Sequence, residues 1–247
     1  MIADKTLTLS IVIPAYNEEA VLGACLHAIA KQTVPPDEVI VVDNNSSDAT
    51  AAIAASFPFV TVIHEPAQGI IAAHHAGFRK TSSNLIARID ADTVMSKTWV
   101  ERVLSDFKTH KKLDALTGPG AVYELAFEDL YPGEIFSKYY FALGRRLFGL
   151  QLLWGSNMVI TKSMWEKIEQ DTCQNERLVH DDVDISLLVH HLGGTIMYDR
   201  YLKVYIHGIR FIAPKKVAHY HRKIVKTREY HIKRGTYTPR HRRIKAY

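Results

Sequence analysis

The sequence predicts an α/β protein built on an open, mostly parallel β-sheet with helices on both faces. Its first half alternates short runs of β-branched residues with segments of helical periodicity, which is the pattern of consecutive βαβ units. The 247-residue chain is 47% hydrophobic and 23% charged, so it can bury a full-sized core and is not disordered, collagen-like or coiled-coil. In this fold class, ligands bind beyond the carboxyl ends of the strands.

Four apolar runs in the first half are predicted as buried parallel strands. They cover residues 9–14, 38–43, 60–64 and 85–90. The first connecting helix is expected at about residues 18–32. The second is expected to start at Ser46 and Ser47, which are good N-cap residues, with Asp48 in the first turn, where the helix dipole favours an anion.

Two further helices complete the alternating half of the chain. The third is expected directly after Gly69. The fourth follows the strand at 85–90, and its apolar residues recur with a 3.6-residue period. Its predicted buried face consists of Trp99, Val100, Val103, Leu104 and Phe107. Four strands and four helices in series predict a doubly wound sheet.

From about residue 113 the alternation breaks down. We expect a strand near 157–160, a helix at 163–169, a helix at about 182–192 ended by Gly193 and Gly194, and strands near 195–198 and 203–206. The segment 124–154 is rich in aromatic residues, which favours either a helical layer packed on the sheet or an acceptor groove. These residues are Phe127, Tyr131, Phe136, Tyr139, Tyr140, Phe141, Phe148 and Trp154.

Charge is distributed unevenly along the chain. The net charge is +5, but residues 201–247 hold 14 lysines and arginines against one acid, Glu229. A basic tail therefore follows an acidic body, which indicates a polyanionic partner: nucleic acid, an anionic lipid surface or a phosphate-bearing substrate. Read as a helix, the tail from Lys215 onward either lies on an anionic membrane surface or is a solvated end.

The cysteines and the apolar segments indicate the compartment. Cys25 and Cys173 are far apart, so they form neither a disulfide framework nor a thiolate metal site. The N-terminus has no basic segment followed by an apolar one, and no apolar run approaches the roughly 18 residues of a spanning helix. We therefore expect a cytoplasmic protein that is soluble or attached to the inner face of the cell membrane.

Polar and acidic residues follow three of the predicted strands. They are Tyr16, Asn17 and Glu18 after the first, Asp43, Asn44 and Asn45 after the second, and Asp90 and Asp92 after the fourth. Carboxylates at a ligand-binding edge repel a bare diphosphate, so this arrangement predicts a divalent cation between them. The triplet Asp90-Ala91-Asp92 suits that role, although Asp92 could instead cap a helix beginning near Ser96.

Five ordered motifs resemble those of the family 2 glycosyltransferases, inverting enzymes of the GT-A fold. They are IVIPAYNEE, VVDNNSSDAT, QGIIAAHHAGF, ARIDADT and VHDDVDISLLVHHLGG, in the order and approximate spacing of the family, over about residues 7–210. The resemblance implies one GT-A domain over 1–210, with a nucleotide-sugar half (about 1–112) and an acceptor half (about 113–210). The basic helical tail covers 211–247.

The resemblance also implies roles for particular residues. Asp43 is implied to hydrogen-bond the nucleotide base. The full set of residues implied on the nucleotide-sugar side is Pro14, Tyr16, Glu18, Asp43, Asn45, Gly69, Arg88 and Asp90. The metal ligands are Asp92 as the direct ligand, Asp90 and, more distantly in the chain, His207; the ion is Mn²⁺ or Mg²⁺. The acceptor side comprises Gly155, Ser156, Asn157 and Arg210. Asp182 matches the catalytic base.

The chemistry of the acidic residues agrees with these implied roles. Inverting glycosyl transfer needs one carboxylate to remove the acceptor proton and one Lewis acid on the leaving diphosphate. Adjacent Asp181 and Asp182 raise one another's pKa, which keeps one of them a competent base near neutral pH. The alternative is that they are first-turn acids stabilised by the dipole of the following helix. For Asp181, both roles remain open.

The chain departs from the family pattern at three places. It has Asp181-Asp182 where the family usually has Glu-Asp. It has Ile70, Ile71 and His75 where many members carry a basic residue and an asparagine, so contacts with the diphosphate are expected to differ. The Gln-x-x-Arg-Trp element of processive synthases is missing, which favours transfer of a single sugar.

We therefore predict a metal-dependent inverting glycosyltransferase that uses a UDP- or GDP-linked sugar. The acceptor would be a lipid-linked molecule, a cell-envelope glycan or a small molecule. The alternative is a protein that binds nucleic acid or an anionic surface through its basic tail, but the tail has no recognised nucleic-acid motif, so no nucleic acid is expected. A nucleotidyltransferase would show a Gly-rich basic loop where this chain has PAYNEE, and an inactive scaffold would not retain both sets of acids.

Overall fold

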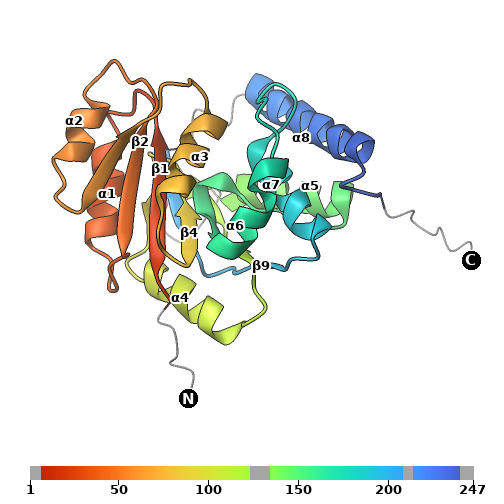
Figure 1. The fold of residues 1–247 in the computed structure, drawn as a ribbon, viewed down its shortest axis with the longest axis horizontal. Helices are drawn as coiled ribbons and strands as arrows, with labels where there is room; N and C mark the ends of the chain where they lie inside the picture. The colour runs from red at the N-terminus through yellow and green to blue at the C-terminus, as the bar shows by residue number, and fades with distance from the viewer. Residues whose placement is uncertain (1–6, 123–133, 208–213, 240–247) are drawn as a thin grey trace, which may run out of the picture.

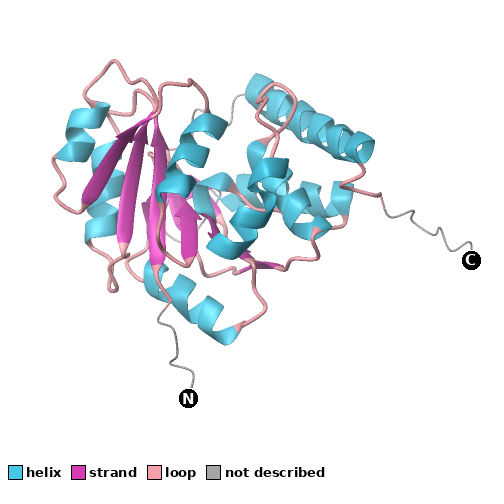
Figure 2. Ribbon diagram, viewed as in Figure 1, coloured by secondary structure: helices cyan, strands magenta, loops and turns pink. Residues whose placement is uncertain are grey.

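The computed structural model describes residues 7–122, 134–207 and 214–239. A seven-stranded sheet forms its centre, in the order β3-β2-β1-β4-β8-β6-β9. Helices cover both faces of this sheet (Figure 2). The predicted α/β class, with an open and mostly parallel sheet, is confirmed.

The first half contains the parallel strands that the sequence predicts. β1 (Leu9–Ala15) lies between β2 (Glu38–Asp43) and β4 (Leu85–Arg88), and β3 (Val60–His64) pairs with β2 at the edge. Every residue of β1 is buried, because helices pack on both of its faces. Its side chains alternate between two hydrophobic clusters, since successive side chains of a strand point to opposite faces.

Each cluster joins the sheet to a different set of helices. Ile11 and Ile13 pack in one cluster with residues of α1 (Leu22–Ala30) and α4 (Trp99–Thr109). Val12 packs in the other cluster with residues of α3 (Ile70–Lys80). The predicted apolar face of α4 is confirmed, with all of its members buried except the half-buried Leu104.

The predicted starts of α1 and α2 are wrong. α1 begins at Leu22, because residues 18–21 form a turn. α2 (Thr50–Ala55) has Ala49 at its N-cap, with no capping side chain. Ser46 and Ser47 instead bond to Asn17 in the neighbouring loop. Similarly, β4 ends at Arg88, two residues before the predicted end.

The second half adds shorter strands and larger helices. β8 (Met158–Thr161) runs antiparallel to β4 and β6 (Ala115–Thr117), and β9 (Ile196–Tyr198) is the far edge strand. β5 (Val94–Met95), β7 (Gly120–Val122) and β10 (Val204–Ile206) form a separate small sheet. The sequence analysis missed β5, β6 and β7, since two or three residues are too few to show a period.

Three helices of the second half pack on strands or on one another. α5 (Glu134–Phe148) packs on β7 and buries Tyr140, Phe141 and Phe148, which confirms a helical layer in the aromatic segment. Phe127 and Tyr131, and the side chain of Phe136, lie outside the described residues. α6 (Lys162–Ile168) and α7 (Asp181–His191) pack together on the sheet. Residues 181–189 of α7 are all buried, so this helix is central.

Within the predicted basic tail, residues 214–234 form α8 (Pro214–Arg234), which lies against α7 (Figure 1). Within the described part of the chain, no helix is both long and apolar enough to cross a membrane. Two 3₁₀ segments, Gly155–Asn157 and Glu169–Asp171, complete the fold.

Candidate active site

The loops after β1 and β2 are tied to each other at the carboxyl edge of the sheet. The Asn17 side chain accepts a hydrogen bond from the Ser47 backbone N–H (2.8 Å), and the Glu18 backbone N–H donates to Thr50 Oγ1 (2.8 Å). Asn17 and Asn45 adopt positive φ angles of 54° and 65°, a conformation that asparagine tolerates better than most residues. Local hydrogen bonds therefore fix this edge.

A cavity of about 320 Å³ opens between these loops and α3. We call it the donor-side cavity. It is lined by Pro14, Ala15, Tyr16, Glu18, Asn44, Gln68, Gly69, Ile70, Ala73, Asp90, Ala91 and Asp92. The expected donor residues Pro14, Tyr16, Glu18, Gly69 and Asp90 are thus brought together with the expected metal ligand Asp92.

Gly69 closes one side of the donor-side cavity in a conformation that requires glycine. Its φ angle is 143°, and a Cβ atom there would lie 2.6 Å from Glu176 Oε1. Its backbone N–H donates to Asn44 Oδ1 at 2.8 Å. The Asn44 amide in turn donates to the carbonyls of Glu65 and Ala67, so Asn44 joins the loop after β2 to the loop between β3 and α3 at the cavity wall.

Asp43 and Asn45 do not line the donor-side cavity. Asp43 ends β2, is buried, and has Oδ2 3.3 Å from His64 Nδ1. Asn45 donates to the Pro66 carbonyl at 2.6 Å. Both residues shape the loop that carries Asn44, and their expected contacts with the nucleotide remain predictions.

A second cavity of about 300 Å³ lies beside the first, and we call it the catalytic cavity. It is lined by Ile70, Arg88, Asp90, Tyr140, Trp154, Ser156, His180, Asp181, Asp182, Ile206, Tyr220 and Lys223. Ile70 and Asp90 line both cavities, so the two meet at these residues. Tyr140 and Trp154 come from the aromatic segment, which therefore serves both as a helical layer and as a cavity wall.

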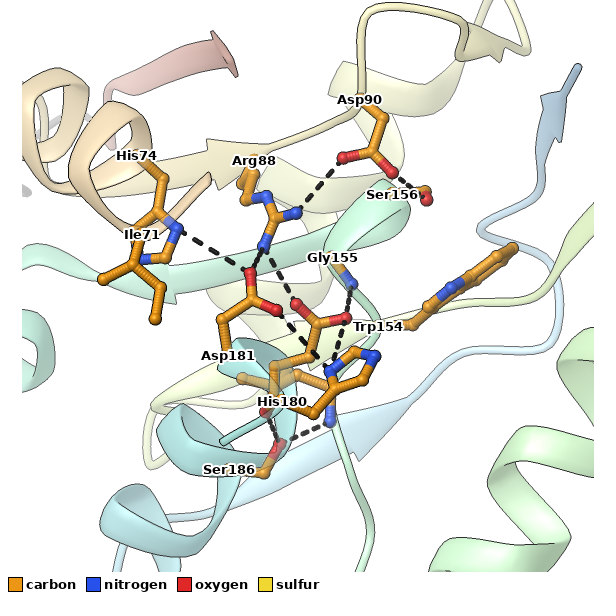
Figure 3. Close-up of polar contacts among 12 residues, drawn as sticks. Ile71, His74, Arg88, Asp90, Trp154, Gly155, Ser156, His180, Asp181 and Ser186 are labelled. Atoms are coloured by element: carbon orange, nitrogen blue, oxygen red, sulfur yellow. Dashed lines mark hydrogen bonds and ion pairs between the residues drawn. The ribbon is translucent and has the colours of Figure 1, made fainter. Parts of the chain in front are cut away.

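Arg88 is the centre of a buried charge cluster in the catalytic cavity (Figure 3). One guanidinium nitrogen donates to Asp181 Oδ2 at 2.6 Å and to Asp182 Oδ1 at 2.9 Å. The other terminal nitrogen lies 3.2 Å from Asp90 Oδ1. The Arg88 side chain is 5% exposed, so its charge is compensated by these carboxylates and not by water.

Arg88 thereby links Asp90, which belongs to the first acidic pair (Asp90 and Asp92), to the second acidic pair (Asp181 and Asp182). β4 supplies Arg88, and the residues directly after it supply Asp90, while Asp181 and Asp182 are the first residues of α7. The sequence analysis placed Arg88 on the nucleotide-sugar side. In the structure it lines only the catalytic cavity, as the counterion of three aspartates.

The two neighbouring aspartates have opposite pKa shifts. Burial and the charge of Asp181 raise the pKa of Asp182 to about 8, against the opposing effects of Arg88 and the Gly155 N–H. Burial also disfavours the charged form of Asp181, but the positive charge of Arg88 outweighs it, and the pKa of Asp181 lies below its usual range. One carboxyl of the pair thus stays ionised while the other exchanges a proton near neutral pH.

The acceptor-side segment directly contacts both acidic groups. The Gly155 backbone N–H donates to Asp182 Oδ2 at 2.7 Å, and the Ser156 hydroxyl donates to Asp90. A Cβ on Gly155 would lie 2.5 Å from Asp182 Oδ1, so only glycine fits there. Asn157 is fully buried and bonds to Trp99 and to the Leu202 carbonyl, and its expected place on the acceptor side remains a prediction.

Two sets of residues could hold a divalent cation. His180, Asp181 and Asp182 offer ligand atoms within 4.8 Å of one another. Both carboxylates of that group already pair with Arg88, whose charge would repel a cation. Asp90 also pairs with Arg88, through Oδ1. However, Asp90 and Asp92 line the donor-side cavity, where the diphosphate is expected, and they offer oxygen ligands, which Mg²⁺ and Mn²⁺ prefer. Position and ligand chemistry therefore favour the second set.

Two expected site residues lie at or beyond the margin of the described structure. His207 directly follows Ile206, the residue of β10 that lines the catalytic cavity. Its role as a metal ligand remains a prediction. Arg210 lies outside the described residues.

Three lining residues of the catalytic cavity were missed by the sequence analysis. His180 is buried beside the acidic pair, with Nδ1 3.5 Å from Asp181 Oδ1, and burial lowers its pKa to about 4. Its position in the sequence directly before Asp181 could have indicated that His180 belongs to the site. Tyr220 and Lys223 come from α8, and no local pattern indicates that this helix reaches the site.

The open sheet, its polar carboxyl edge and the paired cavities define a protein of the GT-A fold. The sequence model described as Glycosyl transferase family 2 matches residues 10–168, and the chain belongs to this family. The match ends before α7, so Asp181 and Asp182 lie beyond it.

Curated glycosyltransferases are similar to this chain in sequence. The chain is 37% identical over 103 residues to glycosyltransferase AglE of Haloferax volcanii, covering 39% of this chain and 34% of the relative. It is 28% identical over 204 residues to the probable glycosyltransferase YdaM of Bacillus subtilis, covering 76% and 48%. The chain therefore spans less than half the length of these relatives.

Two structures show the shared fold. The mannosyltransferase PcManGT of Pyrobaculum calidifontis, in complex with GDP-Man and Mn²⁺, aligns with a TM-score of 0.72 at 16% identity, covering 91% of this chain and 64% of that one. Glucosyl-3-phosphoglycerate synthase of Mycobacterium tuberculosis, in complex with Mn²⁺, UDP and phosphoglyceric acid, aligns with a TM-score of 0.65 at 17% identity, covering 91% and 78%.

Proposed function

We propose that the chain transfers a single sugar from a nucleotide-diphosphate sugar to an acceptor hydroxyl, with inversion at the anomeric carbon. The observation that carries this proposal is the meeting of the two cavities at Asp90. The donor-side cavity joins the strand-end loops to Asp92, and the catalytic cavity holds a carboxylate with a raised pKa. A sugar at the junction would have its leaving group on one side and a base on the other.

The donor-side cavity accommodates the nucleotide. Tyr16 is half exposed and offers an aromatic face to a base, and the Glu18 carboxylate offers an acceptor to a ribose. In this proposal the Asp43 carboxylate accepts hydrogen bonds from the ring N–H groups of uracil or guanine. The complexes of similar structures with GDP-Man or UDP support a GDP- or UDP-linked donor.

Asp92, with Asp90, would hold a divalent cation, Mn²⁺ or Mg²⁺. Such an ion, when bound, neutralises the charge that develops on the departing diphosphate. Asp90 is held ready by Arg88 and by the Ser156 hydroxyl, which fix its two oxygens. His207 is a further candidate ligand. The presence of Mn²⁺ in the two similar structures supports this assignment.

Asp182 acts as the general base. Its carboxylate takes the proton of the acceptor hydroxyl as that oxygen bonds to the anomeric carbon. The bond from this carbon to the diphosphate oxygen breaks, and its electron pair leaves with the nucleoside diphosphate. Attack from the face opposite the leaving group inverts the configuration. The Gly155 N–H and Arg88 orient the carboxylate, and a pKa of about 8 suits proton transfer near neutral pH.

Asp181 is a positioning residue in this proposal. It stays ionised, pairs with Arg88 and raises the pKa of Asp182 through its charge. We expect the enzyme to act at the inner face of the cell membrane or in the cytoplasm, on an acceptor such as a lipid-linked molecule or envelope glycan. Nucleic acid is not expected as a partner.

Thermal-shift screening of nucleotide sugars with Mn²⁺ or Mg²⁺ tests the proposal. We expect one donor to stabilise the wild-type chain only when metal is present, and the effect to vanish in Asp92→Ala. Glu166→Ala is the matched control, because it removes an exposed carboxylate outside both cavities. If no nucleotide sugar stabilises the chain, or if Asp92→Ala responds like the wild type, the proposed donor site is wrong.

A further inference from the structure

α8 is fixed to the body of the molecule by buried polar contacts. His231 Nε2 lies 2.9 Å from Asp184 Oδ1, and both side chains are almost fully buried. The Thr227 hydroxyl accepts a hydrogen bond from the His180 backbone N–H at 2.7 Å. At the end of the helix, Arg234 pairs with Asp171 at 2.6 Å. The described helix α8 is therefore docked on the body of the molecule.

The docked helix brings cationic side chains to the mouth of the catalytic cavity. Lys223 lines that cavity together with Tyr220. Lys223 also lines a neighbouring pocket of about 400 Å³, which we call the cationic groove. The cationic groove is lined by Glu176, Arg177, His219, Arg222, Lys223 and Lys226. The shared Lys223 makes the groove continuous with the catalytic cavity.

In the described part of the chain, the cations of the cationic groove form no direct ion pair, although Lys223 lies close enough to Asp181 to lower the pKa of that carboxyl. Among the described residues, no carboxylate forms an ion pair with its arginines and lysines: Arg177, Arg222, Lys223 and Lys226. Glu176, the acid in the groove, accepts a hydrogen bond from the Ile71 backbone N–H at 2.9 Å. Elsewhere on α8, Arg234 is paired with Asp171, and the Arg228 guanidinium lies over the Tyr237 ring.

Grouped cations repel one another, and a bound anion would relieve this repulsion. Arg222 and Lys226 are four residues apart on α8 and so share one helix face, and screening over the Debye length of about 8 Å at physiological salt does not remove the repulsion of such neighbours. Arginine and lysine side chains provide the donors that phosphate oxygens accept. The groove shares no lining residue with the donor-side cavity, so it does not serve the diphosphate of the donor.

We propose that the cationic groove binds a phosphate group of the acceptor and thereby places the acceptor hydroxyl in the catalytic cavity. This inference rests on the proposed glycosyl transfer and names the class of its second substrate, a phosphate-bearing alcohol. The phosphate belongs either to a water-soluble molecule or to a lipid headgroup at a membrane surface. In both cases Lys223 joins the phosphate site to the cavity that contains Asp182.

The test measures binding of two probes to three proteins. The probes are glycerol 3-phosphate, followed by calorimetry, and vesicles of phosphatidylcholine with or without phosphatidic acid, followed by sedimentation. The proteins are the wild type, Lys226→Gln in the groove, and Lys233→Gln as the matched control. Lys233 is an exposed lysine on the same helix and does not line the groove.

We expect Lys226→Gln to bind the phosphate probe on the order of tenfold more weakly, the loss of one charge-assisted contact, while Lys233→Gln binds as the wild type does. Binding of glycerol 3-phosphate would identify a soluble acceptor. Binding only to vesicles with phosphatidic acid would identify a lipid headgroup. Equal binding by the two variants, or no binding of either probe to the wild type, would overturn the inference.

A donor titration on the same samples separates this inference from the proposed function. A chain that binds a nucleotide sugar with Mn²⁺ but neither phosphate probe retains the proposed function and loses the cationic groove as an acceptor site. A chain that binds phosphate in the groove but no nucleotide sugar shows an anion site without the proposed donor. Lys226→Gln should bind the donor as tightly as the wild type, which also shows that the variant is folded.

Discussion

The donor-side and catalytic cavities are neighbours, but they are built in different ways. The donor-side loops are held by single hydrogen bonds at partly or fully exposed positions close to the sheet edge. Some of these bonds are neutral, such as Asn17 with Ser47, and some are accepted by the carboxylates of Glu19 and Asp48. The catalytic cavity is held by a buried cluster of one arginine and three aspartates from distant parts of the chain. Neutral exposed contacts are each worth about 1 kcal/mol, whereas a broken buried ion pair costs about 3–5 kcal/mol. Substitutions should therefore distinguish the two regions.

The largest effect is expected at Arg88. Arg88→Met removes the counterion of Asp181 and Asp182 and leaves their charge buried, so the free energy of unfolding should fall by about 3–5 kcal/mol. Urea denaturation measures this loss. The control is Arg79→Met, which breaks an exposed ion pair with Glu169 and should cost less than about 1 kcal/mol. Equal losses would show that the buried cluster has no special stabilising role.

A smaller loss of unfolding free energy, about 1–3 kcal/mol for each variant, is expected when a methyl group is added to Gly155 beside the catalytic cavity or to Gly69 beside the donor-side cavity. Gly155→Ala would press on the Asp182 carboxylate and should mainly lower kcat. Gly69→Ala would strain the backbone beside the donor-side cavity and should mainly raise KM for the nucleotide sugar. Steady-state kinetics on both variants tests the division of labour. The same kinetic defect in both would contradict it.

The pH dependence should sharpen the comparison further. A base works only when deprotonated, and the pKa of Asp182 is raised to about 8, so kcat/KM should fall as pH decreases through that value. Asp181→Asn removes a neighbouring negative charge that raises this pKa. The acidic limb of the pH profile should then move to lower pH, by on the order of one unit. An unmoved limb would show that Asp181 does not tune the base.

The smallest change in unfolding free energy is expected for a substitution in the donor-side loops. Ser46→Ala removes an acceptor for the Asn17 backbone N–H at an exposed position. The unfolding free energy should change by about 0.5–1 kcal/mol, because water replaces the lost bond. A loss as large as that of Arg88→Met would mean that the loops, and not the buried cluster, are the more tightly coupled part.

The same contrast explains how far the sequence predicts the structure. The parallel strands β1 to β3 have the predicted bounds to within one residue. For β1 and β2 the reason is that strands buried on both faces appear as continuous apolar runs. The prediction that β3 is buried was wrong, because β3 is the edge strand of the sheet and all of its residues are partly or fully exposed. The carboxylates of both cavities were also predicted, since acids at strand ends and at a helix start are visible locally. The start of α2 was wrong, because Ser46 and Ser47 bond to a neighbouring loop instead of capping the helix.

The remaining features depend on contacts between distant segments. Arg88 lies in β4, and its partner Asp181 lies in α7, 93 residues further along the chain. The role of Arg88 as a counterion therefore follows from the docking of α7. The contribution of Lys223 to the catalytic cavity follows from the docking of α8, which depends on the His231–Asp184 pair. Neither contact has a periodic pattern, so sequence alone could not predict them.

Turnover and donor binding measured together on Asp182→Asn test the central claim, that Asp182 takes the acceptor proton. The substitution keeps the shape of the side chain but removes its basicity. We expect the nucleotide sugar to bind as in the wild type, while kcat falls by about 10²–10⁴-fold, the usual contribution of a general base. Turnover equal to that of the wild type would contradict the assignment of Asp182 as the base.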